Sequence, residues 1–165
     1  MSRLVERPSP FPPGRVVTKR WKMRSRFSGG TPGPSSVTVT SAREPIVDRG
    51  WLAPGTHVNA VGSSIPTARE LDSATIAAAA LFVDRRESTV NESGEYLRAV
   101  EEEGIGPDHI RAELGEVLVG SAAGRDSDEE LTVFVSLGLA VEDLAAAEYL
   151  YRRARSEGVG AVVPF

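Results

Sequence analysis

The sequence predicts an α/β protein in which a mainly parallel sheet is flanked by helices. Two observations carry this prediction. Short runs rich in β-branched residues recur along the chain, and segments with helical patterns separate them. Strands that alternate with helices favour a parallel sheet, because a crossover helix returns the chain to the start of the next parallel strand.

Four segments have the composition of strands. Residues 36–40 alternate apolar and polar side chains and are β-branched, as in a half-buried strand. Residues 57–61, 81–84 and 131–136 are short, largely apolar and rich in valine, which favours buried strands. These four segments form the predicted sheet.

The first predicted helix lies within residues 67–80, which end in a run of alanines. Thr67 and Glu70 fit a capping box at its start. Asp72 or Ser73 fits a cap one turn later. The sequence leaves both starts open.

Three further segments are predicted as helices. Residues 91–103 precede Gly104, residues 107–119 precede Gly120, and residues 141–157 precede Gly158. A glycine just after the last helical residue is typical of helix ends. In the last helix, four residues with helical spacing predict a buried stripe: Leu144, Ala147, Tyr151 and Ala154.

The composition excludes several kinds of site. The 165 residues contain no cysteine, which removes disulfides, thiolate metal ligands and cysteine nucleophiles. His57 and His109 are too few for a histidine metal centre or a Ser-His-Asp arrangement, so no metal is predicted. Apolar runs are too short to cross a bilayer, and the N-terminus lacks the apolar core of a secretory signal. We expect a cytoplasmic protein with one core and no membrane partner.

Charge divides the chain into two parts. Residues 1–36 hold eight basic residues and one acidic residue, whereas residues 37–165 hold 11 basic and 22 acidic residues. The first part is also rich in Pro, Gly and Ser, so we predict a disordered segment over residues 1–36 and a folded domain over residues 37–165. With Trp21 and Phe27, the first part fits either a basic arm for nucleic acid or a tail unrelated to the domain. The acidic domain argues against nucleic acid, because it repels phosphate.

Residues 51–72 carry the clearest sign of a ligand site. They read as a turn at residues 53–55, a strand, a glycine-marked exit at residues 62–64 and the start of a helix. In α/β proteins, ligands bind where the carboxyl ends of parallel strands open into a crevice. This exit is therefore predicted to face a ligand.

Several short motifs follow one another along residues 37–165 with a spacing that is characteristic of one family. They are residues 41–46 (SAREPI), 52–62 (LAPGTHVNAVG), 69–72 (RELD), 82–84 (FVD), 112–116 (AELGE), 124–127 (GRDS), 132–134 (TVF), 136–138 (SLG) and 141–143 (VED). Together they resemble the ornithine cyclodeaminase/mu-crystallin family. Residues 1–36 lie outside the resemblance.

The resemblance implies a partial Rossmann-type domain that binds NAD or NADP, within a longer, homodimeric protein. Members of the family transfer hydride between the nicotinamide and a carbon of a small amino or imino acid. They include ornithine cyclodeaminases, alanine dehydrogenases, cyclic ketimine reductases and mu-crystallin. The likeness covers only the second half of the family pattern.

Two parts of the family pattern have no counterpart in these 165 residues. One is the substrate and dimerisation domain, and the other is the first βαβ unit with its glycine-rich pyrophosphate loop. Gly29, Gly30 and Gly33 do not have the G-x-G-x-x-G spacing, and no predicted strand precedes them. The choice between NAD and NADP stays open, because the residue that reads the ribose belongs to the unmatched half.

By the same resemblance, three strand exits contact the cofactor. The residues are Thr40, Ser41, Asn59, Ala60, Val61, Gly62, Ser136 and Gly138. Thr40 and Ser41 also fit plain turn chemistry before Pro45. Gly62 fits either a close backbone approach or a positive φ in a turn, and the two can hold together.

Ser64 and Glu92 are the candidates for contact with the substrate. Some members of the family, the cyclodeaminases among them, carry aspartate at the position of Ser64, the predicted catalytic residue. An unassisted serine does not accept a proton near neutral pH, so Ser64 favours the reductase or mu-crystallin branch. Glu92 fits either a substrate contact or a solvated acid at a helix start. Arg125 fits either an anion site or an ion pair with the nearby acids Asp126, Asp128 or Glu129. His57 is expected to be a strand residue whose ring nitrogens are hydrogen-bonded within the protein.

We therefore expect a fragment that resembles an NAD(P)-dependent oxidoreductase and is inactive alone, because positioning requires the unmatched half. The alternative is a non-enzymatic half-Rossmann protein, either a remnant or a binding subunit that uses an exposed sheet edge.

Overall fold

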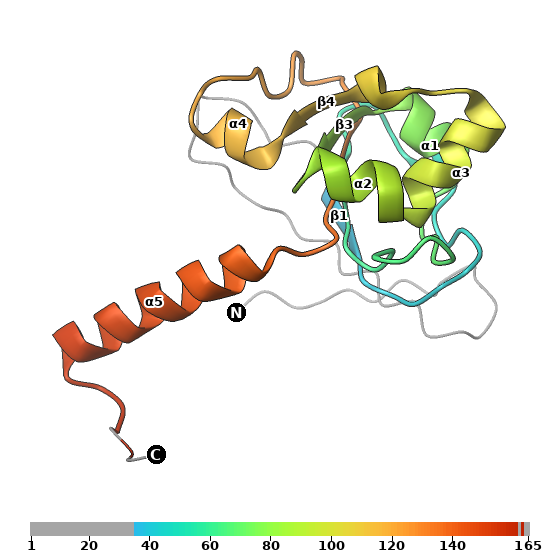
Figure 1. Ribbon diagram of the computed structural model, residues 1–165. Coiled ribbons are helices and arrows are strands. Elements are labelled where there is room, and N and C mark those ends of the chain that lie inside the picture. The colour runs from blue at the N-terminus through green and yellow to red at the C-terminus, as the bar shows by residue number, and fades with distance from the viewer. Residues whose placement is uncertain (1–34, 162, 164–165) are drawn as a thin grey trace, which may run out of the picture.

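A computed structural model describes residues 35–161 and residue 163, and it contains a five-stranded, all-parallel sheet with flanking helices (Figure 1). The predicted fold class is confirmed. The strands are β1 (Ser35–Thr38), β2 (His57–Ala60), β3 (Ala80–Val83), β4 (Ile110–Glu113) and β5 (Thr132–Val135), and their order in the sheet is β1-β2-β5-β3-β4. Most of the predicted disordered segment, residues 1–34, lies outside the described residues. Ser35 and Ser36 belong to β1.

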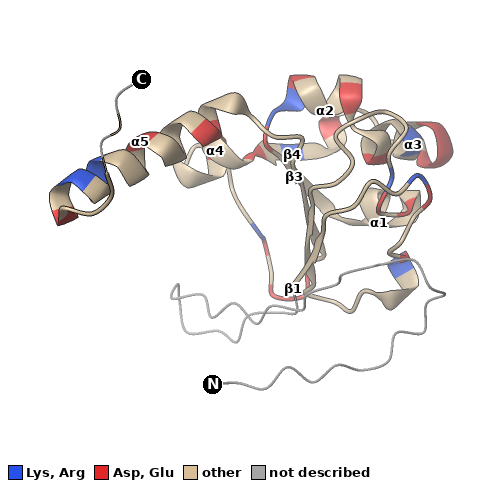
Figure 2. Cartoon of the chain, turned by 90° about the horizontal axis from the view of Figure 1, so that it is seen from below, with Lys and Arg blue, Asp and Glu red and all other residues tan. Residues whose placement is uncertain are grey.

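The described part of the chain also contains five α-helices and two short 3-10 turns. The helices are α1 (Ser73–Ala78), α2 (Arg86–Glu92), α3 (Gly94–Glu103), α4 (Leu114–Leu118) and α5 (Ala140–Glu157), and the 3-10 turns are η1 (Arg49–Trp51) and η2 (Pro107–His109). Helices α1, α2 and α3 lie together on one side of the sheet (Figure 2). No helix in the described residues is long and apolar enough to span a membrane.

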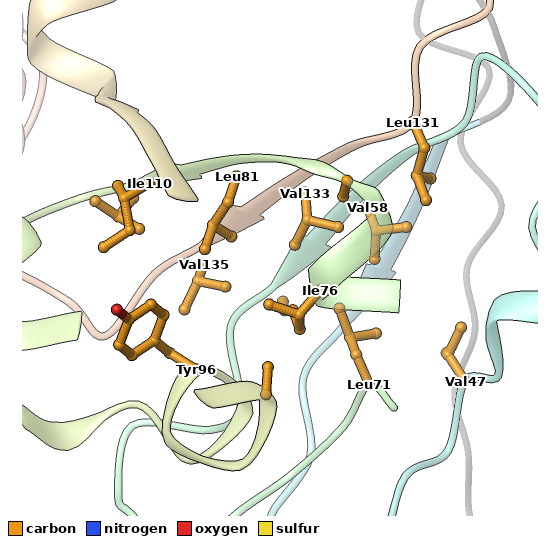
Figure 3. Packing of buried hydrophobic residues seen from close by; sticks show 14 residues of the cluster. Val47, Val58, Leu71, Ile76, Leu81, Tyr96, Ile110, Leu131, Val133 and Val135 are labelled. Atoms are coloured by element: carbon orange, nitrogen blue, oxygen red, sulfur yellow. The ribbon is translucent and has the colours of Figure 1, made fainter. Parts of the chain in front are cut away.

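The core lies between this face of the sheet and helices α1 and α3. Alternate strand residues point into it, among them Val58, Leu81, Val133 and Val135, all fully buried (Figure 3). Alternation arises because successive side chains of a strand point to opposite faces. Ile76, Ala79, Tyr96 and Ala99 fill the helix side of the same cluster.

The second of the two predicted starts for the first helix is correct. Helix α1 begins at Ser73, and the Asp72 carboxylate accepts a hydrogen bond from the Thr75 backbone N–H at 3.0 Å. The capping box of Thr67 and Glu70 does not form, because the Glu70 carboxylate points instead to the ends of β1 and β2.

Two helix predictions need correction. Residues 107–119 form η2, strand β4 and helix α4 in turn, because Ile110 and Ala112 alternate into the core as strand residues. The segment 91–103 is divided between the end of α2 and the whole of α3. The break falls at Ser93, which accepts a hydrogen bond from the Tyr96 N–H as the N-cap of α3.

The predicted buried stripe on the last helix is wrong. Helix α5 extends away from the rest of the domain (Figure 1), and none of its residues, all of which the structure describes, is buried. Leu144 is 69% exposed and Tyr151 is 60% exposed. The four residues do follow one another with helical spacing, but no other described part of the chain packs against them.

Candidate functional site

The three predicted cofactor-facing exits lie next to one another at the carboxyl edge of the sheet. The order of the sheet puts β2 between β1 and β5, and Thr38, Ala60 and Val135 lie in one row across it. The loops that begin after this row carry Thr40 and Ser41, then Val61 to Ser64, then Ser136 to Gly138. Residues from distant parts of the sequence are thereby brought to one edge.

Buried Glu70 fixes the first two of these exits relative to each other. Its carboxylate accepts hydrogen bonds from the Thr38 hydroxyl at 2.9 Å, from the Thr40 N–H at 2.5 Å and from the Gly62 N–H at 2.8 Å. The Glu70 side chain is fully buried. Because one carboxylate accepts hydrogen bonds from both loops, Glu70 acts as a clamp between the ends of β1 and β2.

A second buried acid, Glu95, lies behind Glu70. Its carboxylate accepts a hydrogen bond from the Glu70 backbone N–H at 2.8 Å, and its Oε2 has no hydrogen-bond partner among the described residues. Burial raises the pKa of Glu95 from 4.5 to about 7, and the Glu70 charge adds to this increase. The sheet edge thus rests on two adjacent acids, one of which titrates near neutral pH.

Asp84 holds the third exit. It follows β3, and its Oδ2 accepts hydrogen bonds from the Leu137 N–H at 2.7 Å and the Gly138 N–H at 2.8 Å. The Ser136 hydroxyl lies 3.4 Å from the same oxygen. The turn after β5 is therefore fixed by backbone contacts, and Ser136 has a structural partner in addition to its predicted cofactor role.

The two predicted cofactor glycines play different structural roles. A Cβ on Gly62 would lie 2.1 Å from the Thr40 carbonyl oxygen and 2.4 Å from Glu70 Oε1, so packing inside the protein requires a glycine here. The predicted close approach of a cofactor to this backbone stays a prediction. Gly62 is not among the described glycines with positive φ, and that alternative is wrong. Gly138 has φ of +89° in open space, where a side chain would be strained.

The other predicted residues are placed as follows. Ser64 and Ser41 are exposed in the loops after β2 and β1, Ala60 is buried, and Asn59 is half-buried. Thr40 accepts a hydrogen bond from the Ala42 N–H at 3.2 Å, so the expected turn chemistry is present. Glu92 is the last residue of α2 and is exposed, so it is not an acid at a helix start.

His57 and Arg125 belong to the opposite, amino-terminal edge of the sheet. His57 Nδ1 lies 2.8 Å from the Thr132 hydroxyl and burial lowers its pKa, in agreement with a satisfied sheet residue. Arg125 donates to the carbonyl oxygens of Gly55 and Glu130 and to the Thr132 hydroxyl. Arg125 therefore holds the backbone of two loops by hydrogen bonds. Among the described residues, the expected ion pair with a neighbouring acid is not formed.

A depression of about 430 Å³ lies at this same amino-terminal edge. Its lining includes Asp108, His109, Arg111 and Glu130. His109 Nε2 donates to the Ile76 carbonyl, and Arg111 forms ion pairs with Asp126 and Glu130. The side chains of His109, Arg111 and Glu130 are thus engaged with the protein itself. In the described part of the chain, no cluster of three histidine or acidic side chains is arranged to hold a metal ion.

Sequence reasoning missed the three acids that support the site. Glu70 and Asp84 lie in the motifs RELD and FVD, but their partners are distant in sequence, 32 residues for Thr38 and 53 for Leu137. The available signal was an acid directly after an apolar strand, as in Asp84, or in a loop between strand and helix, as in Glu70. Glu95 lies within the predicted helix of residues 91–103, where an acidic residue is ordinary and gives no such signal.

An all-parallel sheet with flanking helices and small-residue loops at its carboxyl edge defines a Rossmann-type α/β domain. A profile of the ornithine cyclodeaminase/mu-crystallin family matches residues 36–158. The chain belongs to this family.

Individual relatives agree with this assignment. The chain is 41% identical to the alanine dehydrogenase of Archaeoglobus fulgidus over 129 residues, which cover 78% of this chain and 40% of the relative. It is 49% identical to the mouse ketimine reductase mu-crystallin over 115 residues, which cover 70% of this chain and 34% of the relative. It therefore spans about two fifths or less of the length of these relatives.

Solved structures show the same partial coverage. The Thermococcus litoralis Delta(1)-pyrroline-2-carboxylate reductase, in complex with NADH and L-proline, matches with a TM-score of 0.71 and 43% identity, covering 78% of this chain and 40% of that one. An archaeal alanine dehydrogenase dimer with bound NAD matches with a TM-score of 0.69 and 40% identity, covering 79% and 41%.

Proposed function

We propose that this domain supplies the nicotinamide side of an NAD(P) site in an oxidoreductase that acts on a small amino or imino acid. The observation that carries the proposal is the alignment of three strand exits at one sheet edge, held by Glu70 and Asp84. Relatives with 40–43% identity have been solved with NADH or NAD, which supports the same cofactor class.

The residues at this edge fit one end of a dinucleotide. The small exposed side chains of Ser41 and Ser64, and the open space at Gly138, leave room for a flat ring to approach the backbone at this edge. The 165 residues contain no G-x-G-x-x-G loop after a strand, so they lack the usual cradle for the pyrophosphate. We therefore propose that the chain by itself binds the cofactor weakly and is inactive.

The cofactor roles of Thr40, Ser41, residues 59–62, Ser136 and Gly138 are part of this proposal. Ser64 is proposed to face the substrate, as a hydroxyl that orients it by hydrogen bonding, since serine is a poor base. This residue favours reduction of an imino acid over ornithine cyclisation. Glu92 is proposed as a substrate contact in the complete site, and a homodimer is proposed as the assembled form.

A chimera provides the direct test. Residues 36–158 would replace the matching segment of the Archaeoglobus fulgidus alanine dehydrogenase, and NADH oxidation with pyruvate and ammonium, or with cyclic imino acids, would be measured. If this domain provides the nicotinamide side, the folded chimera oxidises NADH, and Ser41→Trp, which adds a bulky side chain at an exposed position of this edge, removes most of this activity. Glu103→Gln, at the exposed end of α3, serves as the matched control that retains it.

A second measurement addresses the isolated chain. Titration with NADH and NADPH, followed by nicotinamide fluorescence, should show no saturation in the micromolar range. Tight binding by the isolated chain would contradict the proposed need for further residues. A folded chimera without activity would instead favour the alternative of a non-enzymatic binding protein, which the exposed helix α5 makes worth testing.

A further inference from the structure

Two buried carboxylates, those of Glu70 and Glu95, connect helix α3 to the loops after β1 and β2. Glu95 is the second residue of α3, and its carboxylate accepts a hydrogen bond from the Glu70 backbone N–H at 2.8 Å. The Glu70 carboxylate in turn accepts the backbone N–H groups of Thr40 and Gly62, which lie on the two loops. A chain of hydrogen bonds thus runs from the start of α3 to two of the three exits of the candidate site.

Both ends of this chain of hydrogen bonds are closely packed. At one end, a Cβ on Gly94 would lie 1.7 Å from the Ala68 carbonyl oxygen, so α3 has no room to approach the loop further. At the other end, a Cβ on Gly62 would lie 2.4 Å from Glu70 Oε1. Close-packed interiors transmit small displacements, because few voids exist to absorb them. A force between the two carboxylates is therefore passed on to the loops.

Glu70 is the charged group that acts on Glu95 through space. Helix α1, which packs against α3, contains no titratable residue. The charged residues of the loop before α1 and of α2 have other partners or are exposed: Arg69 pairs with Glu102, Asp72 caps α1, Arg86 donates to the Ile110 carbonyl, Glu87 pairs with Arg85, and Glu92 is exposed. Among the described residues, neither buried carboxylate forms a salt bridge with a cation.

The charge of this pair changes near neutral pH. Burial raises the pKa of Glu95 to about 7, and the Glu70 charge adds to the increase. When Glu95 is neutral, the pair carries the Glu70 charge alone. When Glu95 is charged, two like charges lie close together in a buried region, where water screens their repulsion poorly.

We propose that Glu95 is a positioning residue that acts through Glu70: its neutral form lets the Glu70 carboxylate hold the loops after β1 and β2 together, and its charged form repels that carboxylate and loosens the hold. The loops carry Thr40 and Gly62, so their relative position sets how well the edge fits a nicotinamide ring. Cofactor affinity therefore falls as the pH rises through neutrality. This last step rests on the proposed function, whereas the coupling between Glu95 and the loops does not.

Nuclear magnetic resonance of the full chain tests the coupling without reference to any activity. The backbone amide signals of Thr40 and Gly62 should shift with pH in one transition centred at about 7, together with the side-chain carboxyl carbon of Glu95. The amides of Leu137 and Gly138, in the turn after β5, are the internal control and should not follow this transition.

The variant Glu95→Gln separates this effect from the titration of any other group. Glutamine keeps an acceptor oxygen for the Glu70 N–H and carries no charge, so the transition at Thr40 and Gly62 should be absent. Circular dichroism shows whether the variant remains folded. Amide shifts that persist in Glu95→Gln, or amides that do not titrate in the natural chain, overturn the proposal.

The chimera that carries residues 36–158 tests the effect on the cofactor. Its KM for NADH should rise about threefold from about pH 6 to about pH 8, whereas the chimera with Glu95→Gln should keep the low value throughout. The kcat profiles of the two should be alike, because Glu95 is buried behind Glu70 and touches no reacting atom. Glu103→Gln, at the exposed end of α3, should behave as the unchanged chimera.

The two experiments distinguish this inference from the proposed function. An active chimera whose KM profile is the same with and without Glu95→Gln overturns the positioning role. An inactive chimera, combined with Thr40 and Gly62 amides that follow Glu95, supports the coupling and counts against the proposed function instead.

Discussion

At the scale of single residues, buried carboxylates organise the candidate site. Glu70 accepts backbone N–H groups from the loops after β1 and β2, and Asp84 accepts them from the turn after β5. Because backbone groups are the donors, substitution of the loop side chains leaves these contacts in place, except at Gly62, where a Cβ would lie 2.4 Å from Glu70 Oε1. The positions of the loops are thus set by Glu70 and Asp84, which are themselves buried.

The Glu95 carboxyl predicts a pH dependence of stability. Its pKa is raised in the folded state from 4.5 to about 7, chiefly by burial. The unfolded chain therefore loses this proton first as pH rises, and the free energy of unfolding falls between about pH 4.5 and pH 7, by at most roughly 3 kcal/mol. The stabilising contribution is fully present below pH 4.5 and is lost above pH 7.

Urea denaturation of Glu95→Gln at several pH values measures this effect. The variant carries no titrating group at residue 95, so its stability relative to the natural chain should increase from about pH 4.5 to pH 7 and level off above that. Glu103→Gln, at the exposed end of the same helix, should follow the natural chain throughout. Parallel pH profiles for the natural chain and Glu95→Gln would refute the assignment.

At the scale of elements, the start of α3 packs closely against the loop after β2. Gly94 is buried at the first position of α3, and a Cβ there would lie 1.7 Å from the Ala68 carbonyl oxygen. The contact is with backbone, which cannot rotate away as a side chain can. Gly94 thus allows α3 to bring Glu95 to within hydrogen-bond distance of Glu70.

Alanine substitution at two helical glycines tests this packing. Gly94→Ala should lower the free energy of unfolding by about 3 kcal/mol, because the added methyl group forces the loop or the helix to move. Gly115→Ala in α4, where a Cβ meets nothing within 4 Å, should raise it by about 0.5 kcal/mol through reduced freedom of the unfolded chain. Thermal unfolding of the two variants in parallel measures both changes. Equal effects at the two positions would show that the Gly94 contact relaxes easily.

The elements also show which features of the fold are readable from the sequence. The first strand is marked by β-branched alternation and three others by short, largely apolar runs. The helix ends at Gly104 and Gly158 are marked by glycines that adopt positive φ. Strand β4 was hidden because its four residues lie between Pro107 and Gly120, which resemble the two ends of one helix. Its identity depends on Ile110 and Ala112 reaching the core, a tertiary effect that local composition does not carry.

The candidate site was predictable to a similar extent. Small residues after strands indicated the loops at the sheet edge, and the structure brings those loops together. The contact of Asp84 with the turn after β5 was not predictable from the sequence. It depends on the position of β5 between β2 and β3 in the sheet, although β5 is the last strand in the sequence. Without this order, nothing in the sequence places Asp84 beside Leu137.

At the scale of the whole molecule, stability is concentrated on one face of the sheet. The main cluster of buried residues joins this face to α1 and α3, whereas Asn59 and Phe134 on the other face are half-buried. Parallel sheets are usually covered on both faces. The chain spans about two fifths of its relatives, and the less covered face together with α5 is where we expect further protein contacts.

Removal of α5 tests whether the rest of the domain is stable without it. A chain that ends at Leu139 retains Leu137, which packs against the core, and loses a helix with no buried residue among those described. Its free energy of unfolding, measured by urea denaturation at low protein concentration, should therefore match that of the full chain within about 0.5 kcal/mol. The helical signal in circular dichroism should fall, because α5 is the longest helix among the described residues. A loss of more than about 1 kcal/mol at low concentration would instead mean that α5 packs against its own domain in solution, because removal of an unpacked helix exposes no apolar core.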